Sequence, residues 1–442
     1  MEGRAHSSCF QELHMNVIFF TIVMVSFLTS AWQQLVWIPL GGRKSPMEAL
    51  STAVVDSAAG SVELALGLIG VMTLFLGLMK VAEEGGILKI LARLIRPLMV
   101  RLFPDVPPEH PAMGAMVLNL SANAMGLGNA ATPFGIRAMQ ELEKLNPRPG
   151  TATDAMALFL AINTSSITLL PTGVIALRAA AGSTDPAGIL PTTLFATLFS
   201  TAIAILSAKL YRRLLGRDAA MAGPGVEQDP AAPPDAPVES TGKPYPLWVS
   251  LAALVMVLAM VPVTVVYGRA ISPWVIPFLV AGFLVFGIAT KVRVYEVFVE
   301  GAKDGFQVAV KIIPYLVAIL VAVGMFRASG AMDFMVKWLG PLTGRLGLPP
   351  EALPMALMRP LSGSGAYGIM ASIIKDPAVG PDSYTGYLVS TLQGCTETTF
   401  YVMAVYFGAV QVRRVRYTLA AGLTADLAGI AASVGACLYL YG

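Results

Sequence analysis

Residues 119–135 read NLSANAMGLGNAATPFG, a stretch with three asparagines, three glycines, one serine, one threonine and one proline but no charged residue. It belongs to a chain of 442 residues of which 55% are hydrophobic. Glycine and proline interrupt the helical hydrogen-bond ladder, and an unpaired backbone group is costly in an apolar medium. Polar groups in such a place must face protein or a water-filled cavity. The stretch therefore predicts an interrupted helix that faces a ligand or water.

The composition of the whole chain indicates a polytopic α-helical membrane protein. Only 13% of residues are charged, the mean hydropathy is +0.69, and long apolar runs recur along the sequence. About 20 apolar residues in a helix cross the ~30 Å hydrocarbon layer. We expect an all-α fold with about nine full crossings, near residues 16–38, 61–81, 155–178, 190–210, 246–267, 274–291, 306–327, 385–409 and 418–440.

Two further regions, 111–145 and 351–375, are apolar but are interrupted by glycine, proline, serine and asparagine. They predict re-entrant helical hairpins. A polar, proline-rich segment over residues 213–245 predicts a flexible linker between a first domain, 1–212, and a second domain, 246–442. The first apolar run is longer than the core of a signal peptide, so we expect a retained helix there.

Lysine and arginine are concentrated on one side of the predicted spans. Basic clusters follow the crossings 190–210, 274–291 and 385–409, and they fall on one face if each hairpin returns to the side it entered. Loops rich in Lys and Arg stay in the cytoplasm. The bias predicts a multi-pass membrane protein whose N-terminus and linker are cytoplasmic.

The order of sequence features recurs roughly 240 residues later in the chain. LSANAMG at 120–126 corresponds to LSGSGAY at 361–367, and INTSSIT at 162–168 corresponds to LQGCTET at 392–398. The number of membrane passages between the two units is odd, so the repeats are expected to run in opposite directions. Inverted repeats with interrupted helices at the midplane are a recurring plan of secondary transporters. The alternative is a duplicated scaffold whose breaks only relieve packing.

The polar residues of the two hairpins and of two polar crossings are the predicted substrate-binding site. Neutral amides and hydroxyls can bind a polar solute without the cost of a buried charge. The alternative is that these residues only pack and glue helices together. The predicted binding residues are Asn119, Ser121, Asn123, Asn129 and Thr132 in the first hairpin, Asn163, Thr164 and Ser165 in the crossing 155–178, Arg359, Ser362 and Ser364 in or beside the second hairpin tip, and Gln393, Thr396, Glu397 and Thr398 in the crossing 385–409.

Glu397 lies about halfway along an otherwise uncharged crossing. A carboxylate inside the membrane predicts a function, here recognition of substrate hydroxyls or coupling to Na⁺ or H⁺. The alternative is a structural ion pair with Arg359. Arg359 itself either extends to the membrane surface or binds a carboxylate or an anionic ligand. Asp426 lies nearer to the cytoplasmic end of the last crossing, where we expect it to be solvated.

Several functions are not expected, because the chain lacks the residues for them. The three histidines, His6, His14 and His110, lie outside the predicted spans, and no Cys/His ligand spacing occurs. Metal sites and Ser–His or Cys–His catalysis in the membrane are therefore not expected. No GxxxxGK[ST] motif is present, so ATP is not expected to drive transport through this chain itself. The net charge of +3 predicts no nucleic-acid partner, and we expect neither enzyme activity nor a bound cofactor.

Four motifs resemble a known family. NLSANAMGLGNAATPFGIRAMQEL and AINTSSITLLPTGVIALRAA are similar to spore maturation protein A, and MALMRPLSGSGAYGIM and STLQGCTETTFYVMAVYFGAV are similar to spore maturation protein B. The chain thus resembles a fusion of two members of the nucleoside-recognition (Gate) family, which is related to parts of concentrative nucleoside transporters. The resemblance implies inverted repeats, hairpins, a homo-oligomer and a Gln-Thr-Glu motif at the substrate. Gln393, Thr396 and Glu397 are similar in kind, but Gly394 and Cys395 lie between Gln393 and Thr396.

These observations together predict an inner-membrane secondary transporter or permease for a small polar solute, either nucleoside-like or a small organic anion. The solute and the lipid bilayer are the expected partners. The solute would bind at the midplane between the two repeats. One alternative is a membrane module that senses a ligand or assists envelope assembly without transport. Another is a translocase for a lipid or a lipid-linked precursor.

Overall fold

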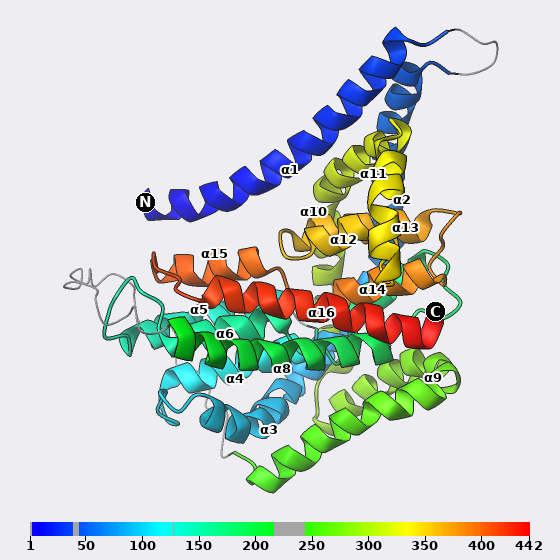
Figure 1. The fold of residues 1–442 in the computed structure, drawn as a ribbon. Coiled ribbons are helices and arrows are strands. Elements are labelled where there is room, and N and C mark those ends of the chain that lie inside the picture. Colours follow the sequence, from blue (N-terminus) through cyan, green and yellow to red (C-terminus); the bar gives the residue numbers. More distant parts are fainter. Residues whose placement is uncertain (1, 39–43, 127, 216–243) are drawn as a thin grey trace.

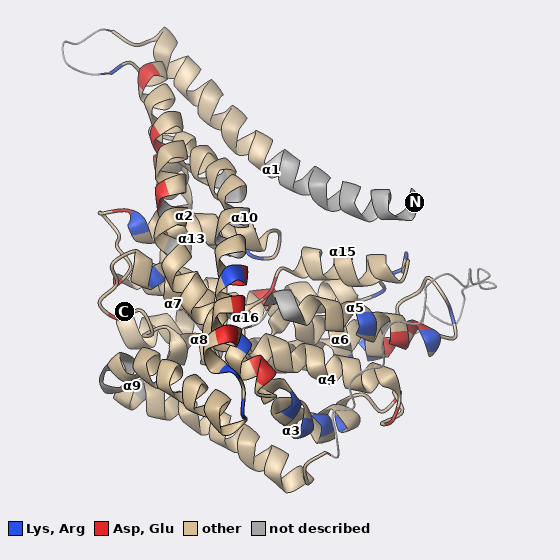
Figure 2. Ribbon diagram, turned by 180° about the vertical axis from the view of Figure 1, so that it is seen from behind, with Lys and Arg blue, Asp and Glu red and all other residues tan. Residues whose placement is uncertain are grey.

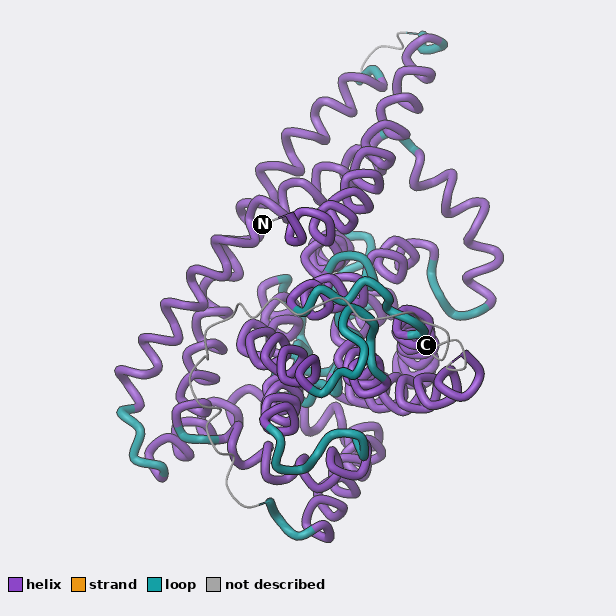
Figure 3. The backbone as a smooth tube through the Cα atoms, turned by 90° about the vertical axis from the view of Figure 1, so that its left-hand side faces the viewer, coloured by secondary structure: helices purple, strands orange, loops and turns teal. Residues whose placement is uncertain are grey.

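The computed structural model is all-helical wherever it is described (Figures 1 and 3). The described residues are 2–38, 44–126, 128–215 and 244–442. One isolated bridge, between Thr151 and Arg414, is present in these ranges. The predicted all-α class is confirmed. Most of the predicted linker, residues 216–243, lies outside the described ranges.

Most of the longest helices contain a segment with the length and composition of a membrane span. The longest helices are α1 (Glu2–Leu35), α2 (Pro46–Glu84), α8 (Leu190–Leu215), α9 (Leu247–Ala289), α10 (Val294–Ala328) and α16 (Thr418–Tyr441). Within the described residues, segments of α2, α8, α9 and α16 are long and apolar enough to cross a membrane. A fifth candidate is the pair formed by the end of α10 and the start of α11 (Ala331–Arg345), bent by 74°. The structure supports a multi-pass membrane protein, and the count of about nine crossings stays a prediction.

One long helix covers two of the predicted crossings. Residues 246–267 and 274–291 both fall largely within α9, which contains three internal prolines. Proline removes a backbone hydrogen bond and kinks a helix without always ending it. The proline-containing stretch between the two apolar runs therefore stays helical, although the sequence predicts two separate crossings there.

Helices α2 and α10 pack side by side and run antiparallel (Figure 1). A Cβ atom built on Gly77 would lie 2.8 Å from the ring of Phe298, and one built on Gly305 would lie 2.7 Å from the Cα atom of Thr73. Residues later in α10 therefore contact residues earlier in α2, as expected for an antiparallel pair. Glycine at these points lets two helices approach more closely than larger residues allow.

Adding a methyl group at Gly305 is expected to destabilise this helix pair. The new Cβ would meet the Cα atom of Thr73 at 2.7 Å and the carbonyl oxygen of Met72 at 2.8 Å, and neither backbone atom can move without shifting α2. Overpacking of this kind costs about 1–3 kcal/mol. We expect Gly305→Ala to lower the midpoint of thermal unfolding in detergent.

Gly70→Ala in α2 is the matched control, because nothing lies within 4 Å of a Cβ atom built there. Alanine is the better helix former, so this variant should be as stable as the parent protein or slightly more stable. An unchanged or higher midpoint for Gly305→Ala would contradict the close approach of α2 and α10.

Both regions that the sequence predicts as hairpins are interrupted helices. In the first, α4 (Pro111–Ala124) packs against α5 (Gly128–Lys144). The turn between them includes Gly126, whose φ of +75° favours glycine. In the second, the short helix η2 (Pro350–Ala352) and α12 (Leu353–Met358) precede α13 (Gly363–Lys375), against which α12 packs. The amphipathic helix α3 (Ile87–Leu102) lies beside α4.

The two polar crossings are also interrupted near their middles. The crossing 155–178 is divided into α6 (Asp154–Ser165) and α7 (Thr172–Ala180). The crossing 385–409 is divided into α14 (Tyr384–Cys395) and α15 (Thr399–Ala409), with Thr396 in an extended conformation. The backbone at both breaks bonds to distant segments instead of to its own helix.

Charged side chains are unevenly distributed over the helices. Figure 2 shows Lys and Arg gathered on α3 and charges of both signs near the loops, while α15 carries none. Helices α8 and α16 lie side by side, and the interrupted helices pack around them. Buried charges are rare in such an interior, so each one indicates a specific structural or functional role.

Candidate functional site

The four interrupted elements meet at one place, which we call the central junction. The backbone N–H of Glu397, in the α14–α15 break, donates to the carbonyl oxygen of Thr164 at the end of α6, at 2.7 Å. Each break also contacts a hairpin: the Leu169 N–H donates to the Ala124 carbonyl, at 2.9 Å, and the Phe400 N–H donates to the Pro360 carbonyl, at 3.1 Å. Backbone groups freed from two helices are thus paired across the two halves of the chain.

The first hairpin brings three of the predicted asparagines into or near this junction. Asn123 donates from its amide nitrogen to the side-chain oxygen of Asn163, at 3.0 Å, and Asn163 donates to the Phe159 carbonyl, at 2.9 Å. Asn119 donates to the Ala131 carbonyl at 2.8 Å and to the Tyr406 hydroxyl at 3.1 Å. All three asparagines are buried. Asn119 therefore ties the two helices of the hairpin to α15.

The hydroxyls predicted in the first half mostly bond to their own helices. Ser121 donates to the Val117 carbonyl at 2.8 Å, while Thr164 and Ser165 both donate to the Ala161 carbonyl. Such bonds satisfy a buried hydroxyl within its own helix. Their role in substrate binding stays a prediction. Thr132 is half-buried, and the side chain of Asn129 lies outside the described part of the structure.

Arg359 is buried beside the second break. Its guanidinium donates to the Thr396 carbonyl oxygen and, at 3.3 Å, to the Thr398 hydroxyl. With 4% of its surface exposed, it does not extend to the membrane surface, so that alternative was wrong. The unwound backbone supplies an acceptor carbonyl at this depth. Arg359 thereby holds the α14–α15 break in its extended conformation.

The serines after Arg359 organise the start of α13. The Ser362 hydroxyl accepts from the Gly365 N–H at 3.0 Å, as an N-cap does, and lies 3.4 Å from the Ser364 hydroxyl. A Cβ atom on Gly363 would lie 2.9 Å from the Thr398 hydroxyl oxygen, so the hairpin tip touches the break closely. Ser362 and Ser364 thus lie at the junction, although their first role there is structural.

Glu397 has few contacts that would fix its side chain. The side chain is 46% exposed, and one of its oxygens lies 4.0 Å from Arg359, the long limit for an ion pair. Ion pairs with this much exposure contribute little to stability. Gln393, one helical turn earlier, has a buried side-chain oxygen without a partner in the described structure. Both residues therefore have hydrogen-bonding capacity that the described part of the protein leaves unused.

Asp426 is buried, contrary to the expectation that water solvates it. Only 2% of its surface is exposed, and the Thr399 hydroxyl donates to one carboxylate oxygen at 2.7 Å. The expectation was wrong because α16 packs against α6, α8, α14 and α15 at this depth. Two glycines of α16, Gly422 and Gly429, allow this close packing.

Two charged clusters lie at opposite ends of α8. In the Asp154 cluster, Asp154 accepts from Arg212, Arg416 and Tyr417, each at 2.8 Å. In the Asp382 cluster, Asp382 accepts from Arg178 at 3.0 Å and, in addition, from Ser183 and Thr184. About 20 residues of α8 separate them, a helical length of about 30 Å. Each cluster joins the first half of the chain to the second.

Sequence reasoning did not single out Arg178, although it is completely buried. Its guanidinium also donates to the Pro381 carbonyl at 2.6 Å and lies 4.3 Å from the centre of the Tyr387 ring. A lone arginine at the end of a predicted crossing was a signal for such a role. Tyr406, the partner of Asn119, had no signal in the sequence.

Acid is expected to weaken the Asp382 cluster. Burial by itself would raise the pKa of the Asp382 carboxyl, but hydrogen bonds from Ser183 and Thr184 and the charge of Arg178 lower this pKa below its usual value of 3.8. A lowered carboxyl pKa stabilises the folded protein above the unfolded pKa, and this stabilisation is lost as the pH falls through the folded pKa.

We therefore expect Asp382→Asn to lower the unfolding temperature at neutral pH and to reduce its dependence on pH below about pH 4. The measurement is thermal unfolding of both proteins in detergent across an acid series. Parallel curves for the variant and the parent protein would show that Asp382 contributes nothing to the acid sensitivity.

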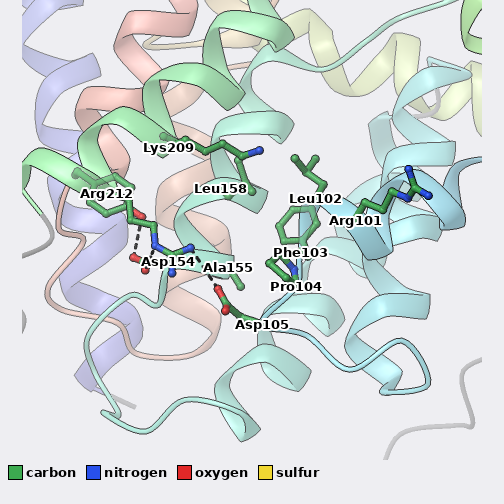
Figure 4. A pocket seen from close by; sticks show the side chains of 12 residues that line it. Arg101, Leu102, Phe103, Pro104, Asp105, Asp154, Ala155, Leu158, Lys209 and Arg212 are labelled. Atoms are coloured by element: carbon green, nitrogen blue, oxygen red, sulfur yellow. Dashed lines mark hydrogen bonds and ion pairs between the residues drawn. The ribbon is translucent and has the colours of Figure 1, made fainter.

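Two cavities lie away from the central junction. One, of about 110 Å³, borders the Asp154 cluster, where Arg212 bridges Asp154 and Asp105 (Figure 4). The other, of about 210 Å³, lies beside the ion pair of Arg327 with Asp376. Glu397 lines neither of them. Among the described residues, no group of three or more His, Cys, Asp or Glu side chains could hold a metal ion.

Comparison with known proteins identifies the two halves that meet at the junction. The sequence pattern of the family described as "Nucleoside recognition", Gate, matches residues 65–181 and 309–413, which include both pairs of interrupted elements. The chain belongs to the Gate family. The resemblance inferred from the sequence motifs is confirmed.

Relatives of this Gate protein each match a part of the chain. Spore maturation protein B of Bacillus subtilis is 47% identical over 167 residues, 38% of this chain and 93% of that protein. Spore maturation protein A of Bacillus subtilis is 47% identical over 169 residues, 38% of this chain and 86% of that protein. Inner membrane protein YjiG of Escherichia coli is 31% identical over 108 residues, 24% of this chain and 67% of that protein. No solved structure matches the chain.

Proposed function

We propose that this Gate protein is a secondary transporter or permease of the bacterial inner membrane for a small polar solute, nucleoside-like or a small organic anion. The central junction carries the proposal, because unwound backbone from two interrupted helices meets there between two hairpin tips. Such backbone is tolerated at membrane depth only inside protein or beside a water-filled cavity. In transporters built from inverted repeats, backbone of this kind binds substrate and coupling ions.

The packing of equivalent helices supports an inverted repeat. The α2–α10 pair is antiparallel, and so is α8–α16, where Tyr441 bonds to the Gly188 carbonyl and Ser200 bonds to the Ala425 carbonyl. In each pair one helix comes from the first half and the other from the second. Inverted halves can rock about a fixed central site, which gives alternating access.

Unused hydrogen-bonding groups supply the contacts for a solute. Asn119 and Gln393 each keep a buried oxygen without a partner in the described structure, and each can accept from an N–H or O–H donor. Glu397 can accept from hydroxyls, as on a ribose. The Asn123–Asn163 pair adds amide groups nearby. A nucleoside carries the N–H and O–H donors that these oxygens can accept from. The family description, nucleoside recognition, supports nucleosides as the substrate class.

The test is flux through proteoliposomes that contain the purified full chain. The panel comprises labelled nucleosides, small organic anions, amino acids and a fluorescent lipid. We expect saturable uptake of one nucleoside or anion. Tight binding of a ligand that never crosses the membrane would indicate a sensor instead of a transporter. Movement of the lipid alone would favour a lipid translocase. We also propose a cytoplasmic N-terminus and linker and a homo-oligomer, which cysteine accessibility and light scattering would test.

A further inference from the structure

Asp426 has a carboxylate oxygen that nothing in the described structure satisfies. One oxygen accepts from Thr399 at 2.7 Å, while the other is buried without a hydrogen-bond partner. The residue lies in the middle part of α16 with 2% of its surface exposed. An ionised carboxylate buried in this way is strongly unfavourable unless a positive charge or a proton accompanies it.

Among the described residues, no Lys, Arg or His side chain forms an ion pair with Asp426. Within the described structure, the ionisable groups that interact electrostatically with Asp426 are Arg359 and Cys395. Arg359 forms no ion pair with Asp426, because its guanidinium donates to Thr396 and Thr398. The other helices packed on α16 at this depth present hydroxyls from α6 and α8, Thr164 and Ser200. Asp426 thus faces neutral oxygen atoms and one cation held at a distance.

Two glycines bring this carboxylate against both interrupted helices. A Cβ atom on Gly422, one turn before Asp426, would lie 2.9 Å from the methyl carbon of Thr399 and 3.6 Å from the Thr164 hydroxyl. One on Gly429, a turn later, would lie 2.8 Å from the methyl carbon of Thr396. Asp426 therefore lies between the ends of α6 and α14 and the start of α15. Any rocking of the halves would change its surroundings.

We propose that Asp426 is the coupling site of this protein and binds a single positive charge, as H⁺ or Na⁺, at its free carboxylate oxygen. This inference rests on the proposed transport function, and it assigns the ion to Asp426 and the solute to Glu397. One carboxylate among hydroxyls suits a monovalent ion, whereas divalent sites in proteins use several charged ligands. Bound charge favours the closed packing of α16, and its release permits the halves to separate.

The binding step is tested first without any solute. Thermal unfolding of the full chain in detergent is followed with Na⁺ replaced by choline at constant ionic strength, and separately from about pH 5 to pH 8. A ligand that binds only the folded protein raises the unfolding temperature. We expect the parent protein to respond to Na⁺ or to pH, and Asp426→Asn to lose that response. Asp304→Asn, an exposed aspartate of α10, is the matched control and should keep it.

Transport then tests the coupling. We expect Asp426→Asn to exchange solute across the membrane nearly as the parent does, but to lose gradient-driven accumulation by about tenfold or more. Accumulation that depends on Na⁺ would identify Na⁺ as the coupling ion. Accumulation that depends on pH alone would identify H⁺. If no solute crosses with the parent protein, the transport proposal fails while the thermal experiment still decides whether Asp426 binds a cation.

Two results would overturn the inference. One is a parent protein whose stability and uptake are indifferent to both Na⁺ and pH. The other is an Asp426→Asn variant that keeps the response of the parent. If Asp426→Asn does not fold, Thr399→Val keeps the carboxylate and removes its hydrogen bond. That variant should shift the half-maximal Na⁺ concentration, or the midpoint of the pH response, by about tenfold or one pH unit, and an unshifted response would reject the site.

Discussion

Replacing Glu397 by glutamine is expected to abolish solute uptake and to leave the fold intact. The Glu397 side chain is 46% exposed and approaches Arg359 only to 4.0 Å, so its charge is not needed for packing. Glutamine has the same shape but cannot accept hydrogen bonds as a carboxylate does, and bonds to charged groups contribute about 1.5–3 kcal/mol. Uptake should fall by about 100-fold, as initial rates in proteoliposomes would show.

The matched control is Glu300→Gln, which makes the same change at an exposed position of α10. Both variants should unfold within a degree or so of the parent protein, since exposed substitutions change stability by less than about 0.5 kcal/mol. Normal uptake by Glu397→Gln would remove this residue from the mechanism. Loss of both uptake and stability would instead favour the structural pair with Arg359.

Replacing Arg178 by leucine is expected to have the largest effect on stability. Arg178 is completely buried, and its guanidinium donates to Asp382, to the Pro381 carbonyl and to the Asp185 carbonyl. Without it, the Asp382 carboxylate would lose its charged partner and the Pro381 carbonyl would lose this hydrogen bond, where two loops of different halves meet. Breaking a buried ion pair by removing one partner costs about 3–5 kcal/mol. The unfolding temperature in detergent should fall by roughly 3–5 °C.

Arg327→Leu is the control for this result, because the Arg327–Asp376 pair has one-third of the arginine surface exposed. Pairs of that kind contribute about 0–1 kcal/mol. The loss of stability in Arg178→Lys should lie between those of Arg178→Leu and Arg327→Leu, since lysine keeps the charge but cannot present the planar fork to several acceptors. Equal effects of Arg178→Leu and Arg327→Leu would show that the Asp382 cluster does not hold the two halves together.

The first hairpin could be predicted from the sequence because its cause is local. Gly126 supplies the positive φ of the turn, and apolar residues flank it on both sides. The all-helical class and the membership of the Gate family also follow from composition and motifs. Each of these depends on residues that are neighbours in the chain.

The break at Thr396–Thr398 could not be predicted, since it contains neither glycine nor proline. Its backbone is extended because Arg359 binds the Thr396 carbonyl and Thr164 accepts from the Glu397 N–H. Neither partner is close in the sequence. A helix gives up its own hydrogen bonds only where the fold supplies others, so the position of such a break belongs to the tertiary structure.

The burial of Asp426 likewise could not be inferred from its place in a helix. Counting residues along α16 gives the depth of the carboxylate but not the helices that surround it. The close packing depends on Gly422 and Gly429 meeting threonines of the interrupted helices. Several predicted hydroxyls, such as that of Ser121, turned out to bond to their own helices.

The sequence by itself determined the apolar surroundings of this protein, its helical class, its family and the polar segments in which to seek a site. Only the tertiary structure decided which of those polar groups meet, that Arg359 binds unwound backbone, and that Asp426 is enclosed. The physical reason is the distance along the chain over which each property is determined. Hydropathy and helix interruption are properties of a short segment, whereas a buried hydrogen bond such as that from Asn119 to Tyr406 joins residues brought together only by packing of the whole chain.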